Sequence, residues 1–426
     1  MNPKSSLKTL SELLASSASK QSHRRLQTGE CQTSTQKRCS LCFASAIDYE
    51  AELRDKQTAI STFWQSLGTD IPCDSLVASP LGRNYRTVSK RKAFIVGRRF
   101  FLGLIGVDDD SSKSYPMDIQ ECVIEPKSHA HIYSVIQEQL QRKEQSNLVT
   151  EFNYVIVKGD DREAIVIFNM NHFSSANRRE VNALSKSLTF KAKNVQGVYV
   201  FVDEERSNYY LSGTPRKGVQ SNPKPLTKIY GNDKLFHTVG GVKFLYSPLS
   251  FTQTNHSIVE KFVSTAKSLL QLAKDDMLFD LYCGYGLFSL SLAAEVKHVT
   301  GIELSRSSIS DAIDNAKRNK LINARFHAAD ISADTLPRFF HRLPEVRPSA
   351  GLKFLIDPPR NGTSEEVIEL LADQQPQKVV HIFCNSDIIA KELHRWKECG
   401  YLPKKAVPFD MFPGTSEIEM MILLEK

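Results

Sequence analysis

The chain has 426 residues, enough for two or three domains with one full-sized core. It is 41% hydrophobic and 24% charged, and no apolar run reaches the roughly 18 residues that span a bilayer, which argues against a membrane protein. Its formal net charge of +7 is modest. Eight cysteines without the apolar core of a secretory signal indicate a reducing compartment, so we expect a cytoplasmic location.

The first 30 residues are rich in serine and lysine, and Glu12 and Glu30 are their only acids. This composition predicts a disordered basic tail. A transit peptide is an alternative interpretation, because such peptides are also basic, serine-rich and poor in acids.

Residues 31–130 form a predicted N-terminal region with two signals. The first is a set of four cysteines, Cys31, Cys39, Cys42 and Cys122. The second is the stretch 81–100, in which lysine and arginine residues alternate with aromatic residues. This stretch contains no acidic residue. Such a surface suits phosphate contact and base stacking, which predicts an RNA-facing stretch. A solvated basic hairpin is the alternative.

Residues 131–245 are predicted to be a central α+β domain. Short alternating strands such as YVIVKG, AIVIFNM, GVYVFVD, YYLSG and FLYSP are separated by turns, and a helix is expected near 177–188.

In residues 246–426, predicted strands alternate with predicted helices. Strands are predicted at 277–282, 298–303, 324–329, 353–357 and 378–384, helices at 286–296, 305–320, 364–373 and 387–398, and a terminal hairpin at 403–411 and 417–425. This rhythm predicts a Rossmann-like α/β domain, doubly wound around a mostly parallel sheet.

Acids and glycines follow the strands of this last domain. Asp280 and Gly284 flank the end of the first strand, Glu303 ends the second and Asp330 ends the third. Acids at successive strand ends predict a shared nucleoside-binding edge, although each acid could instead cap the helix that follows it. Phe288 stands near the place of the third glycine of a pyrophosphate-binding turn, which argues against NAD and favours a cofactor without phosphates.

The last two strand ends carry reactive groups. Asp357-Pro358-Pro359-Arg360 follows the fourth strand, and Arg360 stands where enzymes that methylate exocyclic amines place an aromatic residue. Cys384 ends the fifth strand just before a helix, and a helix N-terminus stabilises a thiolate. A buried core cysteine is the alternative. Glu419 lies in the terminal hairpin, with Glu417 as a second candidate carboxylate.

Six motifs, FTQTN, DLYCGYGLF, GIEL, DPPRNG, FCNSDIIAKEL and DMFPGTSEIE, occur in the order found in RNA uracil-5 methyltransferases. The chain resembles this family from Cys31 to its end. The resemblance implies a class I methyltransferase domain that binds S-adenosylmethionine and methylates carbon 5 of a uridine. The cofactor residues that the resemblance implies are Gln253, Tyr282, Glu303 and Asp357, and the positions of Gly284 and Asp330 at strand ends add these two to the predicted site. Cys384 is then the nucleophile that attacks carbon 6, and Glu419 accepts the carbon 5 proton.

The sequence departs from the family at two positions. The family usually has histidine where this chain has Glu417, and serine where it has Phe383. Both positions adjoin the expected nucleophile or base, so they bear on rate and substrate fit.

The four N-terminal cysteines suit a 4Fe–4S cluster, with zinc as the competing metal, and Cys73, Cys283 and Cys399 are expected to be structural. With this cysteine set the chain is most similar to the branch that methylates bacterial 23S rRNA. We therefore expect a monomeric enzyme that acts on an RNA loop and not on DNA. A tRNA uridine-5 methyltransferase and a non-catalytic iron–sulfur RNA-binding protein are the alternatives.

Overall fold

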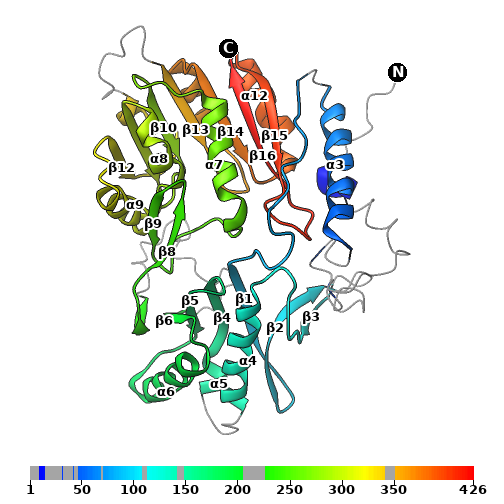
Figure 1. Ribbon diagram of the computed structural model, residues 1–426, viewed down its shortest axis with the longest axis vertical. Helices are drawn as coiled ribbons and strands as arrows, with labels where there is room; N and C mark the ends of the chain where they lie inside the picture. Colours follow the sequence, from blue (N-terminus) through cyan, green and yellow to red (C-terminus); the bar gives the residue numbers. More distant parts are fainter. Residues whose placement is uncertain are drawn as a thin grey trace. The chain divides into compact units, whose positions relative to one another are not determined.

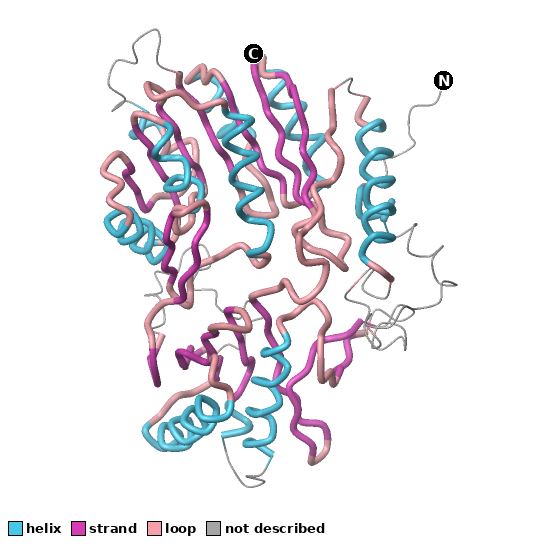
Figure 2. The backbone as a smooth tube through the Cα atoms, in the orientation of Figure 1, coloured by secondary structure: helices cyan, strands magenta, loops and turns pink. Residues whose placement is uncertain are grey.

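The computed structural model describes residues 9–14, 31, 42, 47–68, 71–107, 113–141, 148–204, 226–340 and 351–426 (Figures 1 and 2). The chain divides into two compact units. The first contains residues 1–28, 47–82 and 236–426, and the second contains residues 29–46 and 83–235. Among the helices of these described parts, none is both long and apolar enough to cross a membrane.

A mixed sheet forms the centre of the first unit. In spatial order its strands are β12 (Ala324–Ala328), β11 (His298–Glu303), β10 (Met277–Leu281), β13 (Leu352–Ile356), β14 (Lys378–Phe383), β16 (Glu419–Glu425) and β15 (Leu402–Phe409). The strands from β12 to β14 are parallel, whereas β16 runs antiparallel to both of its neighbours. Strands β10 and β13 are buried along their whole length, as expected for central strands of a sheet covered on both faces.

Helices lie on both faces of this sheet. They are α7 (His256–Leu270), α8 (Leu287–Leu292), α9 (Arg306–Arg318), α10 (Pro337–Phe340), α11 (Glu365–Asp373) and α12 (Ile389–Glu398). Helix α7 contacts β14, β16 and α8, while α11 contacts α12, which contacts β15. Figure 1 shows α7 in front of the sheet and α12 behind it. The predicted doubly wound α/β fold is confirmed, and every strand and helix predicted in residues 277–425 is present near its expected limits.

A segment from much earlier in the chain completes this unit. Helix α3 (Tyr49–Ser66) belongs to it, and residues 72–77 run parallel to the edge strand β15. The backbone N–H of Asp74 donates to the carbonyl of Ala406, and that of Val77 donates to the carbonyl of Pro408, each at 2.9 Å. The sequence assigned these residues to a separate N-terminal region of 31–130. Their pairing with β15 spans more than 300 positions, and no local pattern reveals it.

A second mixed sheet forms the second unit. Its strands are, in spatial order, β3 (Ser114–Met117), β2 (Arg99–Val107), β1 (Val88–Val96), β4 (Phe152–Gly159), β5 (Ala164–Met170), β6 (Val195–Val202) and β7 (Thr227–Gly231). Helices α4 (Lys127–Gln141) and α6 (Ser175–Lys191) supply Ile132, Ile136 and Val181 to the core, with α5 (Leu148–Glu151) nearby. The expected boundary at residue 130 lies within α4, and the sheet joins the regions on both sides of it, because β1 pairs with β4. The expected strand YYLSG lies outside the described residues.

A short hairpin precedes the site. Strands β8 (Leu235–Val239) and β9 (Val242–Tyr246) pair with each other, and β9 lies against α9. The side-chain amide of Asn315 accepts a hydrogen bond from the N–H of Leu245 at 2.8 Å and donates one to its carbonyl at 2.9 Å. These two bonds fix the hairpin against the helix that follows β11.

Candidate active site

The parallel strands bring the predicted acids to one edge of the sheet. Asp280 lies in β10, Glu303 ends β11, Asp357 follows β13 and Cys384 follows β14. Register pairs Asp280 with Gly301 and with Leu355, so these strand ends are level with one another. Ligands of open parallel sheets bind outside this carboxyl edge.

The loop after β10 leaves room for a ligand. Tyr282 and Gly284 both have positive φ, of 63° and 54°, so the chain turns sharply at the strand end. A Cβ built on Gly284 would meet no heavy atom within 4 Å, which means that the space beside this glycine is open. Burial is the main cause that raises the pKa of Tyr282 to about 12, and the carboxylates of Glu392, Asp330 and Glu303 contribute to this rise. The expected acids therefore do gather around this loop.

Asp280 is bonded to the helix that follows its strand, as the capping alternative suggested, and its second oxygen is not used in this way. Its Oδ2 accepts hydrogen bonds from the backbone N–H of Ser289 at 2.8 Å and from its hydroxyl at 2.6 Å, so it holds the first turns of α8. Its Oδ1 is buried and has no hydrogen-bond partner among the described residues. Burial raises the pKa of Asp280 to about 7 against these two bonds, and Glu303 adds to the rise.

Glu303 connects two loops at this edge. Its Oε2 accepts a hydrogen bond from the N–H of Gly284 at 3.3 Å, and its Oε1 accepts one from the N–H of Ser305 at 2.7 Å. The carboxylate is thereby fixed beside the open glycine. Asp330 is exposed beyond β12, and Gln253 is 6% exposed just before α7.

Cys384, Glu419 and Asp357 form a cluster at the end of β14. The Cys384 thiol donates to the carbonyl of Pro358 at a distance of 3.7 Å. Burial raises the pKa of Asp357 to about 7 and raises that of Glu419 well above its ordinary value, with Asp357 as the second cause for Glu419. The Oε2 atom of Glu419 is buried without a hydrogen-bond partner in the described part of the chain.

The electrostatics of Cys384 differ from the sequence prediction. We expected the following helix to stabilise a thiolate, yet burial and the carboxylates of Glu419 and Asp357 raise the pKa of this thiol to about 12. A short 3₁₀ turn, Ser386–Ile388, separates Cys384 from the first residue of α12, so the dipole of that helix acts from a distance. The guanidinium of Arg360 acts in the opposite direction and lowers the pKa of Cys384, but by less than these causes raise it. A pKa raised in this way favours the protonated thiol at neutral pH.

The two unusual residues of the family motifs have separate explanations. Arg360 donates through Nη2 to both oxygens of Glu417, at 3.1 and 2.9 Å, so Glu417 is engaged in an ion pair. Phe383 is 1% exposed and stacks on His381 with ring centroids 4.2 Å apart, so it packs in the core.

Sequence reasoning missed Glu392 in α12. Its Oε1 accepts the backbone N–H of Thr363 at 2.9 Å, and Gly362 has a φ of 75° where a Cβ would lie 1.8 Å from the same oxygen. Burial raises the pKa of Glu392 to about 7. This carboxyl group thus holds the loop that carries Asp357 and Arg360. The signal was present, because Glu392 lies within the motif FCNSDIIAKEL.

The structure describes three of the four cysteines expected to bind a metal. Cys31 is buried, while Cys42 and Cys122 are half-buried. Burial raises the pKa of the Cys122 thiol, and Cys42 is close enough to contribute to that rise. Cys39 lies outside the described residues. Within the described residues, no group of three or more potential metal ligands is found.

The basic stretch divides into buried and exposed cations. Arg91 is 1% exposed and makes a bidentate pair with Glu125, with both N–O distances 2.7 Å. Arg91 therefore has a structural role and is not an RNA contact. Lys90 and Lys92 lie over the ring of Tyr154, and the hairpin between β1 and β2 exposes Arg98 and Arg99.

Comparison with known proteins relates this chain to RNA methyltransferases. Residues 229–426 match the family model of tRNA (uracil-5-)-methyltransferases. An uncharacterized RNA methyltransferase of Caldanaerobacter subterraneus subsp. tengcongensis is 34% identical over 201 residues, which are 47% of this chain and 43% of that protein. The matched region thus spans less than half the length of that relative.

Two further matches cover most of the chain. An uncharacterized RNA methyltransferase of Halalkalibacterium halodurans is 26% identical over 395 residues, covering 91% of this chain and 81% of the relative. The crystal structure of a Pyrococcus abyssi tRNA (uracil-54, C5)-methyltransferase in complex with S-adenosyl-L-homocysteine is similar in fold. Its TM-score is 0.66 at 19% identity, over 91% of this chain and 84% of that one. Residues 229–426 are therefore similar to tRNA (uracil-5-)-methyltransferases, and most of the chain is similar to an RNA methyltransferase.

Proposed function

We propose that this protein transfers a methyl group from S-adenosylmethionine to carbon 5 of a uridine in RNA and so forms 5-methyluridine. The observation that supports this most is the cluster of Cys384, Glu419 and Asp357 at the carboxyl edge of the sheet. A thiol and a buried carboxyl group beside a nucleoside-binding edge are the minimum set for covalent methylation of a pyrimidine ring.

The residues at the edge fit the cofactor. Asp280 offers a buried oxygen without a partner among the described residues, and Gly284 borders open space. The neighbouring carboxylates would favour a bound cation, because their raised pKa values show that buried negative charge lacks compensation there. We propose that S-adenosylmethionine, which supplies an electrophilic methyl group on a sulfonium, is held by this set: Gln253, Tyr282, Gly284, Glu303, Asp330 and Asp357.

The chemistry of this chain's own residues follows from carbon 5 of uracil being a poor nucleophile. The Cys384 thiol gives its proton to solvent water, and the thiolate sulfur bonds to carbon 6, which makes carbon 5 electron-rich. Carbon 5 then gains the methyl group and still holds its hydrogen. Glu419, ionised once the positive charge of the sulfonium offsets the effect of burial on its pKa, removes that proton. The sulfur–carbon 6 bond then breaks, and the ring and the Cys384 thiolate are restored.

Activation of Cys384 depends on what binds. Its pKa of about 12 in the ligand-free protein leaves very little thiolate near pH 7. Positive charge beside Glu419 and Asp357 would offset two of the causes of that raised pKa. We propose that the thiol becomes reactive when the sulfonium and the RNA are both in place, which protects it from side reactions beforehand.

Glu419 suits the role of base better than Glu417. Glu419 is 4% exposed and has an oxygen without a partner, as judged over the described residues, whereas Glu417 is paired with Arg360. A base must reach the proton that it abstracts, and a carboxylate engaged by an exposed arginine is directed elsewhere.

Substitution of the nucleophile tests the mechanism. Cys384→Ala should abolish transfer of labelled methyl groups to RNA, while S-adenosylmethionine binding measured by calorimetry persists. Cys399→Ala is the matched control, because Cys399 is also half-buried but lies at the end of α12, and it should retain turnover. Methyl transfer by Cys384→Ala would contradict the proposal.

We further propose a loop of 23S rRNA as the substrate, because carbon 6 is accessible only in an unpaired or flipped-out uridine. Support comes from the cysteine set, which is typical of the rRNA branch, whereas the family model carries the name of tRNA enzymes. Mapping 5-methyluridine in rRNA and tRNA of a deletion strain separates the two substrates.

We also propose that Cys31, Cys39, Cys42 and Cys122 bind a 4Fe–4S cluster. The proximity of Cys42 and Cys122 supports this, since residues far apart in sequence are brought together as thiolate ligands require. Anaerobic purification followed by iron, sulfide and zinc analysis tests the proposal. Four iron and four sulfide per chain are expected, and zinc alone or no metal would contradict it. Loss of metal in Cys122→Ser, with Cys73→Ser unchanged, would assign the ligands.

A further inference from the structure

We propose that helix α3 positions the catalytic base, through a buried ionic network centred on Lys56. This inference rests on the proposed function, because it concerns the loop 410–418 that leads into Glu419. Under this proposal Lys56 touches neither RNA nor cofactor. It holds the loop in the one arrangement from which Glu419 reaches the carbon 5 proton.

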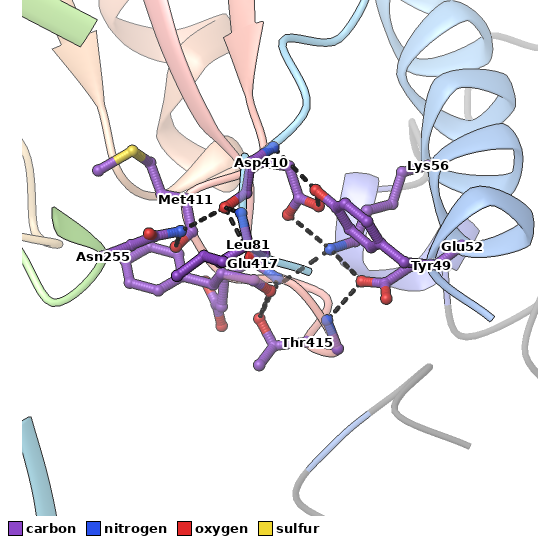
Figure 3. A network of polar contacts seen from close by, with 12 residues as sticks. Tyr49, Glu52, Lys56, Leu81, Asn255, Asp410, Met411, Thr415 and Glu417 are labelled. Atoms are coloured by element: carbon purple, nitrogen blue, oxygen red, sulfur yellow. Dashed lines mark hydrogen bonds and ion pairs between the residues drawn. The ribbon is translucent and has the colours of Figure 1, made fainter. Parts of the chain in front are cut away.

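The network joins α3 to the first residue after β15. Lys56 Nζ lies 2.8 Å from Asp410 Oδ1 and 2.7 Å from Glu52 Oε1, and all three side chains are fully buried (Figure 3). The same ammonium donates to the carbonyl of Phe412 at 3.4 Å. One cation thus contacts the loop at two points.

Two further residues of α3 contact the loop. The Tyr49 hydroxyl donates to Asp410 Oδ2 at 2.9 Å, so both oxygens of that carboxylate are engaged. Glu52 Oε1 accepts a hydrogen bond from the backbone N–H of Gly414. The first half of the loop is therefore bonded to α3 at residues 410, 412 and 414.

Hydrogen bonds within the second half of the loop connect the bonded residues to the segment before Glu419. The Thr415 hydroxyl donates to the carbonyl of Phe412 at 2.8 Å and accepts the N–H of Glu417 at 3.3 Å. Glu419 follows as the first residue of β16 and pairs with Phe409 at the end of β15. Two hydrogen bonds of Thr415 therefore connect the anchored part of the loop to Glu417, two residues before Glu419.

The network also reaches the cofactor side. Asn255 donates through Nδ2 to the Ser79 hydroxyl at 2.9 Å and to the carbonyl of Met411 at 3.2 Å (Figure 3). The Oδ1 atom of Asn255 accepts a hydrogen bond from the N–H of Ser257, so Asn255 caps the N-terminus of α7. Asn255 lies two residues after Gln253. One set of bonds therefore fixes the loop of the base relative to the segment proposed to hold the cofactor.

Stability alone gives a weak reason for buried charges here. A buried ion pair is often no more stabilising than well-packed apolar residues of similar volume, because desolvation offsets the attraction. What directed ionic bonds add is a unique geometry. A base that must reach one hydrogen on a covalently held ring requires such geometry, since small displacements cost large factors in rate.

The test separates formation of the covalent intermediate from its resolution. Single-turnover reactions with substrate RNA and methyl-labelled cofactor are followed for the methylated protein–RNA adduct and for released RNA. Lys56→Met should form the adduct within about threefold of the wild-type rate but resolve it about tenfold or more slowly. Tyr49→Phe, which removes one hydroxyl, should slow resolution in the same sense by a smaller factor. Lys267→Met, at the exposed pair with Glu295, should change neither step.

Glu419→Gln in the same assay distinguishes the two levels of the proposal. If its adduct accumulates, the base assignment holds. The positioning inference then fails if Lys56→Met and Tyr49→Phe slow both steps equally, or slow neither. If Glu419→Gln resolves its adduct at the wild-type rate, the base assignment itself fails.

Discussion

Arg360 and Glu417 form an ion pair in which Nη2 lies 2.9 Å from Oε2, with the two side chains 65% and 32% exposed. Glu417 occupies the position at which the family usually has histidine. The two glutamates of this segment therefore differ in their surroundings. Glu417 neutralises Arg360 near the surface, whereas Glu419 is buried beside Cys384.

The first prediction concerns these two carboxylates. Glu419→Gln should lower turnover by about 10²- to 10⁴-fold, the usual contribution of a general base. Glu417→Gln should lower it by less than about fivefold, because an exposed ion pair contributes roughly 0–1 kcal/mol. Steady-state release of methylated RNA measures both. Equal losses in the two variants would mean that the carboxylates share the role.

Cofactor affinity should depend on pH. Asp280 and Asp357 have pKa values of about 7 in the ligand-free protein, so both become ionised as the pH rises from 6 to 8. A bound sulfonium favours the ionised forms, and the Kd of S-adenosylmethionine should therefore fall over this range, by at most about tenfold per pH unit for each group. S-adenosylhomocysteine, whose sulfur is uncharged, serves as the control in calorimetric titrations. An equal pH dependence for both ligands would contradict the role of these acids.

The thiol of Cys384 should react slowly in the free protein. Its pKa of about 12 means that the thiolate fraction rises about tenfold for each pH unit up to pH 10 and beyond. The rate of iodoacetamide labelling, followed for the peptide that contains Cys384, should rise in the same way without a plateau. A plateau near pH 7 would show a low pKa and an activated resting thiolate.

Phe383 should matter for stability more than for chemistry. It is 1% exposed and stacks on His381, so Phe383→Ser, which restores the residue usual in the family, leaves a cavity and should destabilise the fold by about 3 kcal/mol or more. Urea unfolding measures this loss. The methyl-transfer rate per folded molecule should stay within a few-fold of wild type, and a large loss would place Phe383 in the site.

The cations of the basic stretch should separate into two groups. Arg91→Leu leaves Glu125 buried without its partner and should cost about 3–5 kcal/mol of stability. Arg98→Ala with Arg99→Ala should leave stability unchanged but weaken RNA binding and reduce its salt dependence by about two charges. Binding measured between 50 and 200 mM salt tests this, and an unchanged slope would remove the hairpin from the RNA surface.

Local patterns predicted the parallel sheet well. Apolar runs such as MLFDL and KFLID, each followed by a helical pattern, specify strands whose carboxyl ends must meet, and this placed Asp280, Glu303 and Cys384 at one edge. The terminal hairpin likewise accounts for the pairing of β15 with β16, whereas the pairing of β16 with β14 is a tertiary feature that the hairpin does not specify.

Long-range pairing and burial could not be predicted in this way. Nothing in the pattern of residues 47–82 shows that α3 packs beside loop 410–418 or that residues 72–77 extend the sheet at β15. By composition alone, Arg91 cannot be distinguished from the exposed cations next to it in the sequence. In the structure it is buried and paired with Glu125. The helix after Cys384 suggested a thiolate, but the effect of burial and of two carboxylates depends on a tertiary arrangement that spacing does not reveal.

The most direct test of the central claim is the mass of the peptide that a 5-fluorouridine RNA traps. Fluorine at carbon 5 cannot leave as a proton, so the covalent intermediate persists once the methyl group has been transferred. The account predicts a stable protein–RNA adduct whose digested peptide carries one methylated fluorouridine on Cys384. An adduct on another residue, or none with the RNA and cofactor bound, would contradict it and favour a protein that binds RNA without modifying it.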